Sequence, residues 1–271
     1  MRTLTWEEID KELNEMVGCT EFKEFANNLT KLLQHMSCGR LDAFKKRAYV
    51  FSVNDGDGLG SQVRIINGIL NNYIIEDQVR TVCTKLRYPK ITDVKDSENE
   101  FEFKAHAGNI LRDLTIKEVE AEATRTGREY RILVLDINEW LEKTDSEEFR
   151  AALSRLKDTL DDQMVIFRTN AIDRQALAKI EENISCYMDV QTVCTQPYSI
   201  DDYFEYAMRL SKEYDLEFDD ESLKTFRSLL ILERTNPGFW GFKSIRKMLV
   251  EIMFSALRRE CESEMIYKES E

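Results

Sequence analysis

Two aspartates alternate with two glycines in a segment that has the composition of a ligand-binding loop. Residues 51–70 read FSVNDGDGLGSQVRIINGIL, with Asp55, Gly56, Asp57 and Gly58 at the centre. Carboxylate oxygens at this spacing are calcium ligands in EF-hand loops, whereas glycine-rich turns present backbone N–H groups to phosphates. The residues around this centre therefore decide between a cation site and an anion site.

A calcium site of the EF-hand type would lack two of its ligands here. If Gly58 is aligned with the invariant glycine of an EF-hand loop, Asp55 and Asp57 fall at ligand positions. Val53 then stands at the first ligand position, and Arg64 stands where the bidentate Glu belongs. The preceding AYVFSV is typical of a strand, whereas an EF-hand has a helix there. Calcium is therefore the less favoured interpretation.

The phosphate interpretation fits the elements predicted around the segment. A strand that enters a glycine-rich turn, followed by a helix over SQVRIINGILNNY, points backbone N–H groups and the positive helix end at an anion. A P-loop also needs a Lys for the phosphates and a Ser or Thr for Mg²⁺, and these positions hold Leu59 and Gly60. The backbone frame of a phosphate loop is present without the side chains that bind the ligand.

The segments before and after this loop predict an α/β domain. RILVLD at 131–136 and MVIFRT at 164–169 are apolar runs typical of strands buried in a parallel sheet, and FRAALSRL between them is helical in pattern. Strands that alternate with helices favour βαβ units with right-handed crossovers. Residues 20–36 predict an amphipathic helix. Its apolar stripe contains Phe22, Phe25, Leu29, Leu32, Leu33 and Met36.

The last third of the chain is predicted to be helical throughout. Ser199 has the character of a helix N-cap, Pro197 precedes it, and Pro237-Gly238 interrupts the helical pattern. We therefore expect an α/β domain over residues 1–197 and a smaller helical domain over 198–271.

Four further features receive simple assignments. The acidic segment 91–104 is predicted to be a solvated loop, and the pattern over 108–126 is helical. Trp140 and Trp240 are expected to be packed aromatic side chains, the alternative being that they mark a surface for a partner.

Composition and charge exclude several classes of function. The 51 acidic residues exceed the 38 basic ones and give a formal charge of −13, which disfavours nucleic acid as a partner. No basic, then apolar, leader begins the chain, and no apolar run approaches about 20 residues, so we expect a cytoplasmic protein without a membrane partner. No CxxC pair occurs, so reduced thiols are expected and no metal site. The six cysteines are Cys19, Cys38, Cys83, Cys186, Cys194 and Cys261.

The order of several motifs resembles that of AAA+ ATPases, in particular the subgroup containing red-type rubisco activases and sporulation-stage relatives. VNDGDGLGSQVRIINGIL resembles the Walker A segment GNPGTGKTTVARIIAGIL, whose Lys and Thr correspond to Leu59 and Gly60. RILVLDINEWL resembles Walker B, with Asp136 at the Mg²⁺-binding position and Ile137 in place of the catalytic Glu. The coinciding Walker A residues are Asn54, Gly56, Gly58, Arg64, Ile65, Ile66, Gly68, Ile69 and Leu70.

Further motifs follow the order of the same family. MVGCTEFKEFANNL resembles the helix that flanks the adenine, and VIFRTNAID resembles sensor 1 with Asn170 at its polar position. NISCYMDV resembles the arginine-finger segment with Cys186 instead of Arg, and FKSIRKML resembles sensor 2 with Lys243 instead of Arg. His106 falls where the family carries a pore-loop aromatic residue, which argues against substrate threading.

The resemblance implies a P-loop NTPase-like parallel sheet with flanking helices and a small C-terminal helical lid. It also implies nucleotide-binding positions, here vestigial or weak, and no catalytic or metal-binding residue, Asp136 being a vestigial Walker B position. Those nucleotide-binding positions are Val17, Gly18, Asn54, Asp55, Gly56, Asp57, Gly58, Leu59, Gly60, Ser61, Asn170 and Lys243.

The substitutions at these positions predict loss of ATP hydrolysis. Loss of the P-loop Lys weakens triphosphate binding by about ten- to a hundredfold, and loss of an arginine finger slows phosphoryl transfer by roughly 10³–10⁵. We expect an inactive regulatory or structural subunit of an AAA+ assembly, whose partners are other AAA+ subunits or a protein client, and no cofactor. The alternatives are a sensor that binds ATP or ADP weakly without efficient hydrolysis and, less favoured, an active AAA+ ATPase.

Overall fold

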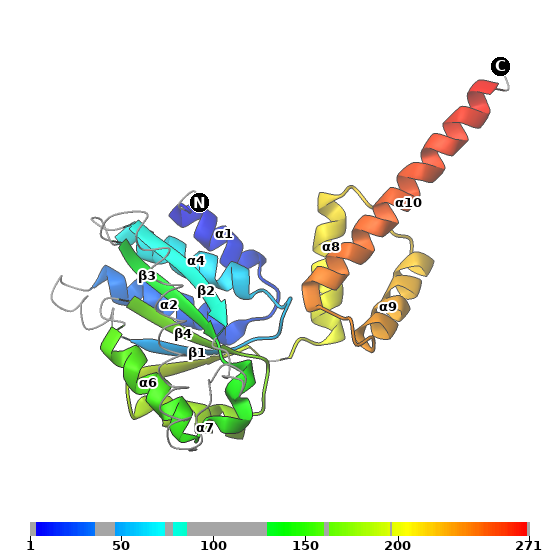
Figure 1. Ribbon diagram of the computed structural model, residues 1–271. Helices are drawn as coiled ribbons and strands as arrows, with labels where there is room; N and C mark the ends of the chain where they lie inside the picture. The colour runs from blue at the N-terminus through cyan, green and yellow to red at the C-terminus, as the bar shows by residue number, and fades with distance from the viewer. Residues whose placement is uncertain are drawn as a thin grey trace. The chain divides into compact units, whose positions relative to one another are not determined.

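The computed structural model describes six stretches of the chain (Figure 1). They are residues 4–35, 47–73, 78–85, 129–159, 163–195 and 197–269. The predicted loop over 91–104, the predicted helix over 108–126, and Met36 and His106 lie outside the described residues.

The chain divides into two compact units that interleave in sequence. The first contains the sheet and comprises Met1–Glu15, Cys19–Val53 and Gly60–Gln196. The second comprises Met16–Gly18, Asn54–Leu59 and Pro197–Glu271. The tip of the glycine-rich loop therefore belongs to the same unit as the C-terminal helices.

Within the described residues, the first unit is built on a parallel sheet of five strands in the order β2-β3-β4-β1-β5. The strands predicted before the loop, at RILVLD and at MVIFRT are confirmed, and so is the α/β class with a parallel sheet. The strand bounds are β1 Ala48–Ser52, β2 Gln78–Lys85, β3 Glu129–Asp136, β4 Gln163–Thr169 and β5 Val190–Cys194.

The sequence did not predict the two edge strands, β2 and β5. β5 has a buried side chain only at Val193, so its sequence VQTVC lacks the continuous apolar run of a central strand. In contrast, every residue of β1 is buried, as expected for a strand covered on both faces.

Helices cover both faces of the sheet (Figure 1). On one face, Phe25 of α2 packs edge-on against Tyr49 and Phe51 of β1 at centroid distances of 5.0 and 5.7 Å. Helices α1 and α4 lie on this same face. The bounds are α1 Trp6–Glu15, α2 Thr20–Gln34 and α4 Leu59–Tyr73.

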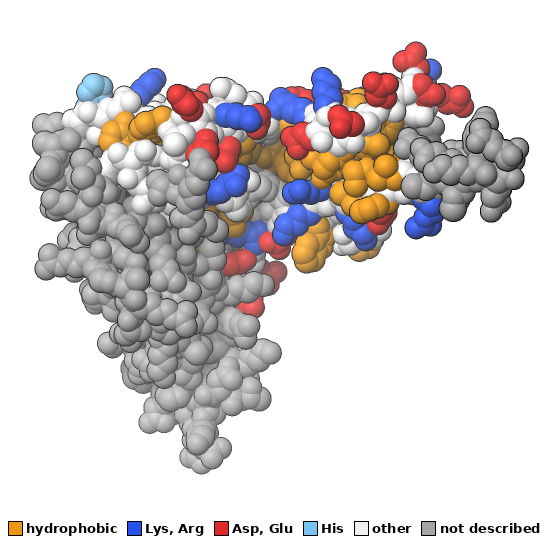
Figure 2. All heavy atoms as spheres, turned by 90° about the horizontal axis from the view of Figure 1, so that it is seen from above, with side chains coloured by type: hydrophobic (Ala, Val, Ile, Leu, Met, Phe, Trp, Pro, Cys, Tyr) orange, Lys and Arg blue, Asp and Glu red, His pale blue; other side chains and the backbone are white. Residues whose placement is uncertain are grey.

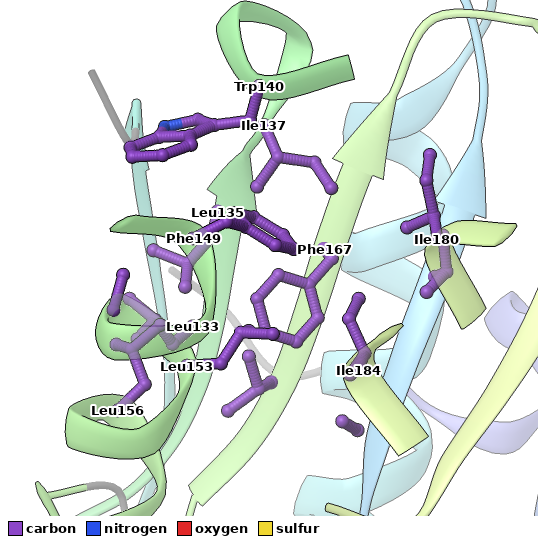
Figure 3. Packing of buried hydrophobic residues seen from close by; sticks show 14 of the residues in the cluster. Leu133, Leu135, Ile137, Trp140, Phe149, Leu153, Leu156, Phe167, Ile180 and Ile184 are labelled. Atoms are coloured by element: carbon purple, nitrogen blue, oxygen red, sulfur yellow. The ribbon is translucent and has the colours of Figure 1, made fainter. Parts of the chain in front are cut away.

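The opposite face carries a hydrophobic core that includes residues of β1, β3 and β4 (Figure 3). Val50 of β1 points here, because alternate strand residues face opposite sides of the sheet. Phe149 and Leu153 of α6 and Ile184 of α7 pack against it, and Trp140, fully buried, closes one end. The covering elements are η2 Asn138–Lys143, α6 Glu147–Thr159 and α7 Arg174–Ser185.

The second unit contains three helices, α8 Ile200–Glu213, α9 Asp220–Arg234 and α10 Gly241–Glu269. Ser199 is the N-cap of α8, as predicted, and forms a capping box with Asp202. Pro237 and Gly238 lie between α9 and α10, which confirms the predicted break. None of the described helices is both long and apolar enough to cross a membrane.

Two predictions about single side chains are wrong. Leu32, placed on the apolar stripe of α2, is 42% exposed, because it lies at the edge of the face that Leu29 and Leu33 bury. Trp240, expected to be packed, is 57% exposed, because it lies in the turn before α10 and not within a helix. The packing predicted for Trp140 is confirmed.

Candidate functional site

The glycine-rich loop connects β1 to α4 and contains two glycines in left-handed backbone conformations. Gly56 and Gly58 have φ values of +87° and +96°, which residues with a Cβ rarely adopt. The Asp57 amide donates to the Asn54 carbonyl oxygen at 3.2 Å, which closes the turn. Leu59 and Gly60 are the first two residues of α4. Because one side chain is a hydrocarbon and the other is a hydrogen atom, neither position supplies a cation or a hydroxyl group.

The Asp57 side chain does not face solvent. It is 3% exposed, and the Tyr203 hydroxyl of α8 donates to its Oδ1 at 3.0 Å. Burial raises the pKa of Asp57 above its ordinary value, although hydrogen bonds from Tyr203 and Asn54 and the charge of Arg234 oppose the shift. Burial also raises the pKa of Tyr203, and the neighbouring charge of Asp57 adds to it. A buried carboxylate therefore lies in the loop that would have to accept phosphate oxygens.

The backbone of the loop also packs closely on the turn before α10. A Cβ built on Gly56 would lie 2.0 Å from the Trp240 carbonyl oxygen, and one built on Gly241 would lie 1.9 Å from Asp57 Oδ1. Both positions therefore require glycine. For Gly58 and Gly60, in contrast, apart from the adjacent residues and the backbone of the same helix, no described atom lies within 4 Å of the place where a Cβ would be.

In the first unit, the Walker B-like carboxylate forms an ion pair with an arginine of the neighbouring strand. Arg168 Nη1 lies 2.7 Å from Asp136 Oδ2, and the Arg168 side chain is 2% exposed. Arg168 Nε donates to the Val53 carbonyl oxygen at 3.0 Å, and Nη2 donates to Asn170 Oδ1 at 2.8 Å. The guanidinium group thus joins the carboxyl ends of β1, β3 and β4.

The second oxygen of Asp136 is engaged as well. Asp136 Oδ1 accepts from the backbone N–H of Asn138 at 3.0 Å and from its Nδ2 at 2.7 Å. Asn138 Oδ1 in turn accepts from the backbone N–H of Asn170 at 2.7 Å. Both carboxylate oxygens of Asp136 and the side-chain oxygen of Asn170 are therefore bound by groups of the chain itself.

The sequence did not single out Arg168 as a functional residue. An arginine near the end of an apolar strand usually reaches solvent, and no motif marks this one. The informative signal would have been a basic residue within MVIFRT together with an Asp at the same end of a neighbouring parallel strand. In the sheet, Asp136 of β3 and Arg168 of β4 are paired in register.

The other predicted positions fall into both units. Ile137, at the catalytic Glu position, is fully buried in the hydrophobic core. Cys186, at the arginine-finger position, is the exposed C-cap of α7. Lys243 Nζ lies 5.8 Å from the centroid of the Trp240 ring. Within the described stretches, no three His, Cys, Asp or Glu residues are grouped to hold a metal ion.

The residues predicted to flank an adenine also pack against the chain itself. Val17 is buried, and Gly18 has a φ of +59°. A Cβ on Gly18 would lie 3.1 Å from the Tyr198 ring and 3.6 Å from Asp202 Oδ1. Of the remaining predicted positions, Asp55 and Ser61 are exposed.

No family model and no curated protein sequence matches the chain. Among solved structures, a chain of the HORMA:CdnC:Trip13 complex of E. coli MS115-1 is similar at 14% identity and a TM-score of 0.44, over 93% of this chain and 86% of that one. PCH-2 of C. elegans is similar at 10% identity and a TM-score of 0.43, over 92% and 72%. A RuvB variant of Thermotoga maritima is similar at 13% identity and 0.43, over 89% and 65%. At these scores and identities, the similarities establish neither an activity nor a partner for this chain.

Proposed function

We propose that the chain is a degenerate AAA+-type module that does not hydrolyse ATP and acts as a regulatory or structural subunit in an assembly with AAA+ subunits or a protein client. The parallel sheet and the order of the Walker A-like loop, Walker B-like strand and sensor 1-like strand support the family proposal. The narrower subgroup of rubisco activases and sporulation-stage relatives stays a prediction, as does a cytoplasmic location.

The observation that carries the proposal is the ion pair between Asp136 and the buried Arg168. A catalytic Mg²⁺ needs carboxylate and water oxygens around it, and in phosphoryl transfer the metal neutralises the developing charge. Arg168 already supplies a fixed positive charge to Asp136 at 2.7 Å, and a divalent cation beside that guanidinium would be repelled. The missing Glu at Ile137 and the missing Lys at Leu59 act in the same direction.

Exposed apolar side chains on the second unit support a protein partner. Figure 2 shows orange side chains on the surface of this unit, between charged ones. Scattered apolar side chains are normal on a protein surface, but grouped ones mark contact sites. Among the residues of this unit whose burial is described, the exposed large apolar ones are Leu229, Ile231, Leu232, Trp240, Phe254 and Leu257.

A sensor that binds ATP or ADP weakly is the second candidate. The open space beside Gly58 and the left-handed conformations of Gly56 and Gly58 favour it, because backbone N–H groups alone can hold an anion. Asp57 in the same loop opposes it by repulsion.

Three measurements on the purified chain test these proposals. We expect no Mg²⁺-dependent ATP turnover above a protein-free control, no heat of binding with millimolar ADP, and a mixed complex by native mass measurement with an AAA+ ATPase from the same source. Turnover that Asp136→Ala abolishes would overturn the proposed inactivity. ADP binding without turnover would favour the sensor, and failure to associate with any such ATPase would refute the role as a subunit.

A further inference from the structure

Five residues of the second unit form the contacts between the tip of the glycine-rich loop and the C-terminal helices. They are Gly56 and Asp57 of the loop, Tyr203 of α8, and Trp240 and Gly241 at the start of α10, and we call them the loop clasp. Residues 57 and 203 are 146 positions apart in the sequence, so the clasp is a tertiary contact and not a local turn.

The backbone part of the clasp is reciprocal. Gly56 leaves room for the Trp240 carbonyl oxygen, and Gly241 leaves room for the Asp57 carboxylate. Both glycines have positive φ values, +87° and +52°, so each position demands glycine for its conformation as well as for space. Each of the two segments therefore requires glycine at the point where it contacts the other, and this restricts the geometry of the contact.

The polar part of the clasp is buried and specific. The Tyr203 hydroxyl donates to Asp57 Oδ1 at 3.0 Å, and the side chains of both residues are almost inaccessible to water, at 4% and 3% exposure. The Tyr203 ring is fixed by edge-on contacts with Phe239 and Phe242, at centroid distances of 5.2 and 5.1 Å. These ring contacts support the orientation in which the hydroxyl donates to Asp57.

We propose that the loop clasp takes the place that a bound nucleotide would have in fixing this loop, so that residues 54–59 stay attached to the C-terminal helices whether or not ATP or ADP is present. A phosphate at the loop would meet the Asp57 carboxylate, which repels it, and would gain no lysine in return, since that position is Leu59. The inference deepens the proposed loss of nucleotide turnover by naming the device that keeps the loop ordered without ligand.

Hydrogen exchange at the backbone N–H of residue 57 reports how well the loop is ordered, because this N–H donates within the loop to the Asn54 carbonyl oxygen. We compare the full-length chain with Tyr203→Phe, Asp57→Ala and Asp57→Asn. Tyr206→Phe is the matched control, because Tyr206 lies on the same helix and also packs on Phe242, at 4.7 Å, whereas the hydroxyl that donates to Asp57 belongs to Tyr203.

We expect Tyr203→Phe and Asp57→Ala each to raise the exchange rate of the loop amides about tenfold or more, because a buried hydrogen bond to a carboxylate is lost. Asp57→Asn, which keeps an acceptor, should recover most of the protection, and Tyr206→Phe should change the rates less than about threefold. Addition of millimolar ADP should leave the exchange of the unmodified chain unchanged.

Each outcome bears on one claim. If Tyr203→Phe leaves loop exchange within the range of the Tyr206→Phe control, the clasp does not hold the loop and the inference is wrong. Protection that rises in the unmodified chain when ADP is added would also overturn it. ATP turnover by the unmodified chain would instead contradict the proposed function, and the exchange data on the clasp would stand.

Discussion

The buried ion pair between Asp136 and Arg168 should show strong energetic coupling. Arg168 is 2% exposed, so Asp136→Ala leaves the guanidinium charge without its counter-ion in the interior, which costs roughly 3–5 kcal/mol of unfolding free energy. Asp136 is 21% exposed, so Arg168→Met leaves a carboxylate that water can partly reach, and it should cost less. Removal of both partners leaves no uncompensated charge. We therefore expect Asp136→Ala and Arg168→Met to be destabilising singly, and the double variant to be less destabilised than the sum of the two by at least about 2 kcal/mol.

An exposed ion pair of nearly the same length provides the control. Lys179 Nζ lies 2.8 Å from Asp145 Oδ2, but both side chains are more than half exposed. Its coupling, measured with Lys179→Met and Asp145→Ala, should be a small fraction of that of the buried pair and should disappear in about 1 M salt. The buried pair should keep its coupling under the same conditions.

Urea unfolding monitored by tryptophan fluorescence is suited to this cycle. Trp140 is fully buried in the core of the first unit, where the ion pair lies, whereas Trp240 belongs to the second unit. A Trp240→Phe background therefore restricts the signal to the first unit. Additive effects of the two substitutions, within about 0.5 kcal/mol, would refute the view that Arg168 is the internal counter-ion of Asp136.

Three further predictions concern single side chains. Burial raises the pKa of Asp57 in the folded chain, so its contribution to stability is fully present below the unfolded pKa and is lost as pH rises through the folded pKa. Asp57→Asn removes this titration, so the melting temperature should depend less on pH, and at pH 7 it should be at least as high as that of the unmodified chain. A lower melting temperature of the variant at pH 7 would contradict this. Ser199→Ala should cost about 1 kcal/mol through loss of the capping box, seen in thermal unfolding, and an unchanged profile would argue against the cap. In peptide-resolved alkylation of the native chain, exposed Cys186 should react well before buried Cys19, and equal rates would be inconsistent with their burial.

The sequence predicted the elements whose patterns are local. The continuous apolar run of β1, the glycine turn and the helix after it could be read directly, and so could the Ser199 cap, because each depends on neighbouring residues. The edge strand β5 was missed, since it has one buried side chain and no clear period.

The decisive contacts of the candidate site could not be read from the sequence. Arg168 and Asp136 are 32 positions apart, and Asp57 and Tyr203 are 146 apart, so both pairings depend on the tertiary fold. The sequence placed Asp57 in the loop correctly but gave no sign that its carboxylate is buried. The sequence shows that a charged residue lies in an apolar strand, but it does not show which residue binds that charge in the fold.

Arg168 also limits how the site could be repaired. If the chain is the degenerate AAA+-type module that we propose, the substitutions Leu59→Lys, Gly60→Thr and Ile137→Glu alone would still leave Asp136 bound to the Arg168 guanidinium. The new Glu would replace a fully buried Ile of the hydrophobic core, which carries its own cost in stability. On that proposal, ATP turnover would require removal of a stabilising contact before any gain in catalysis, so single substitutions should not produce it.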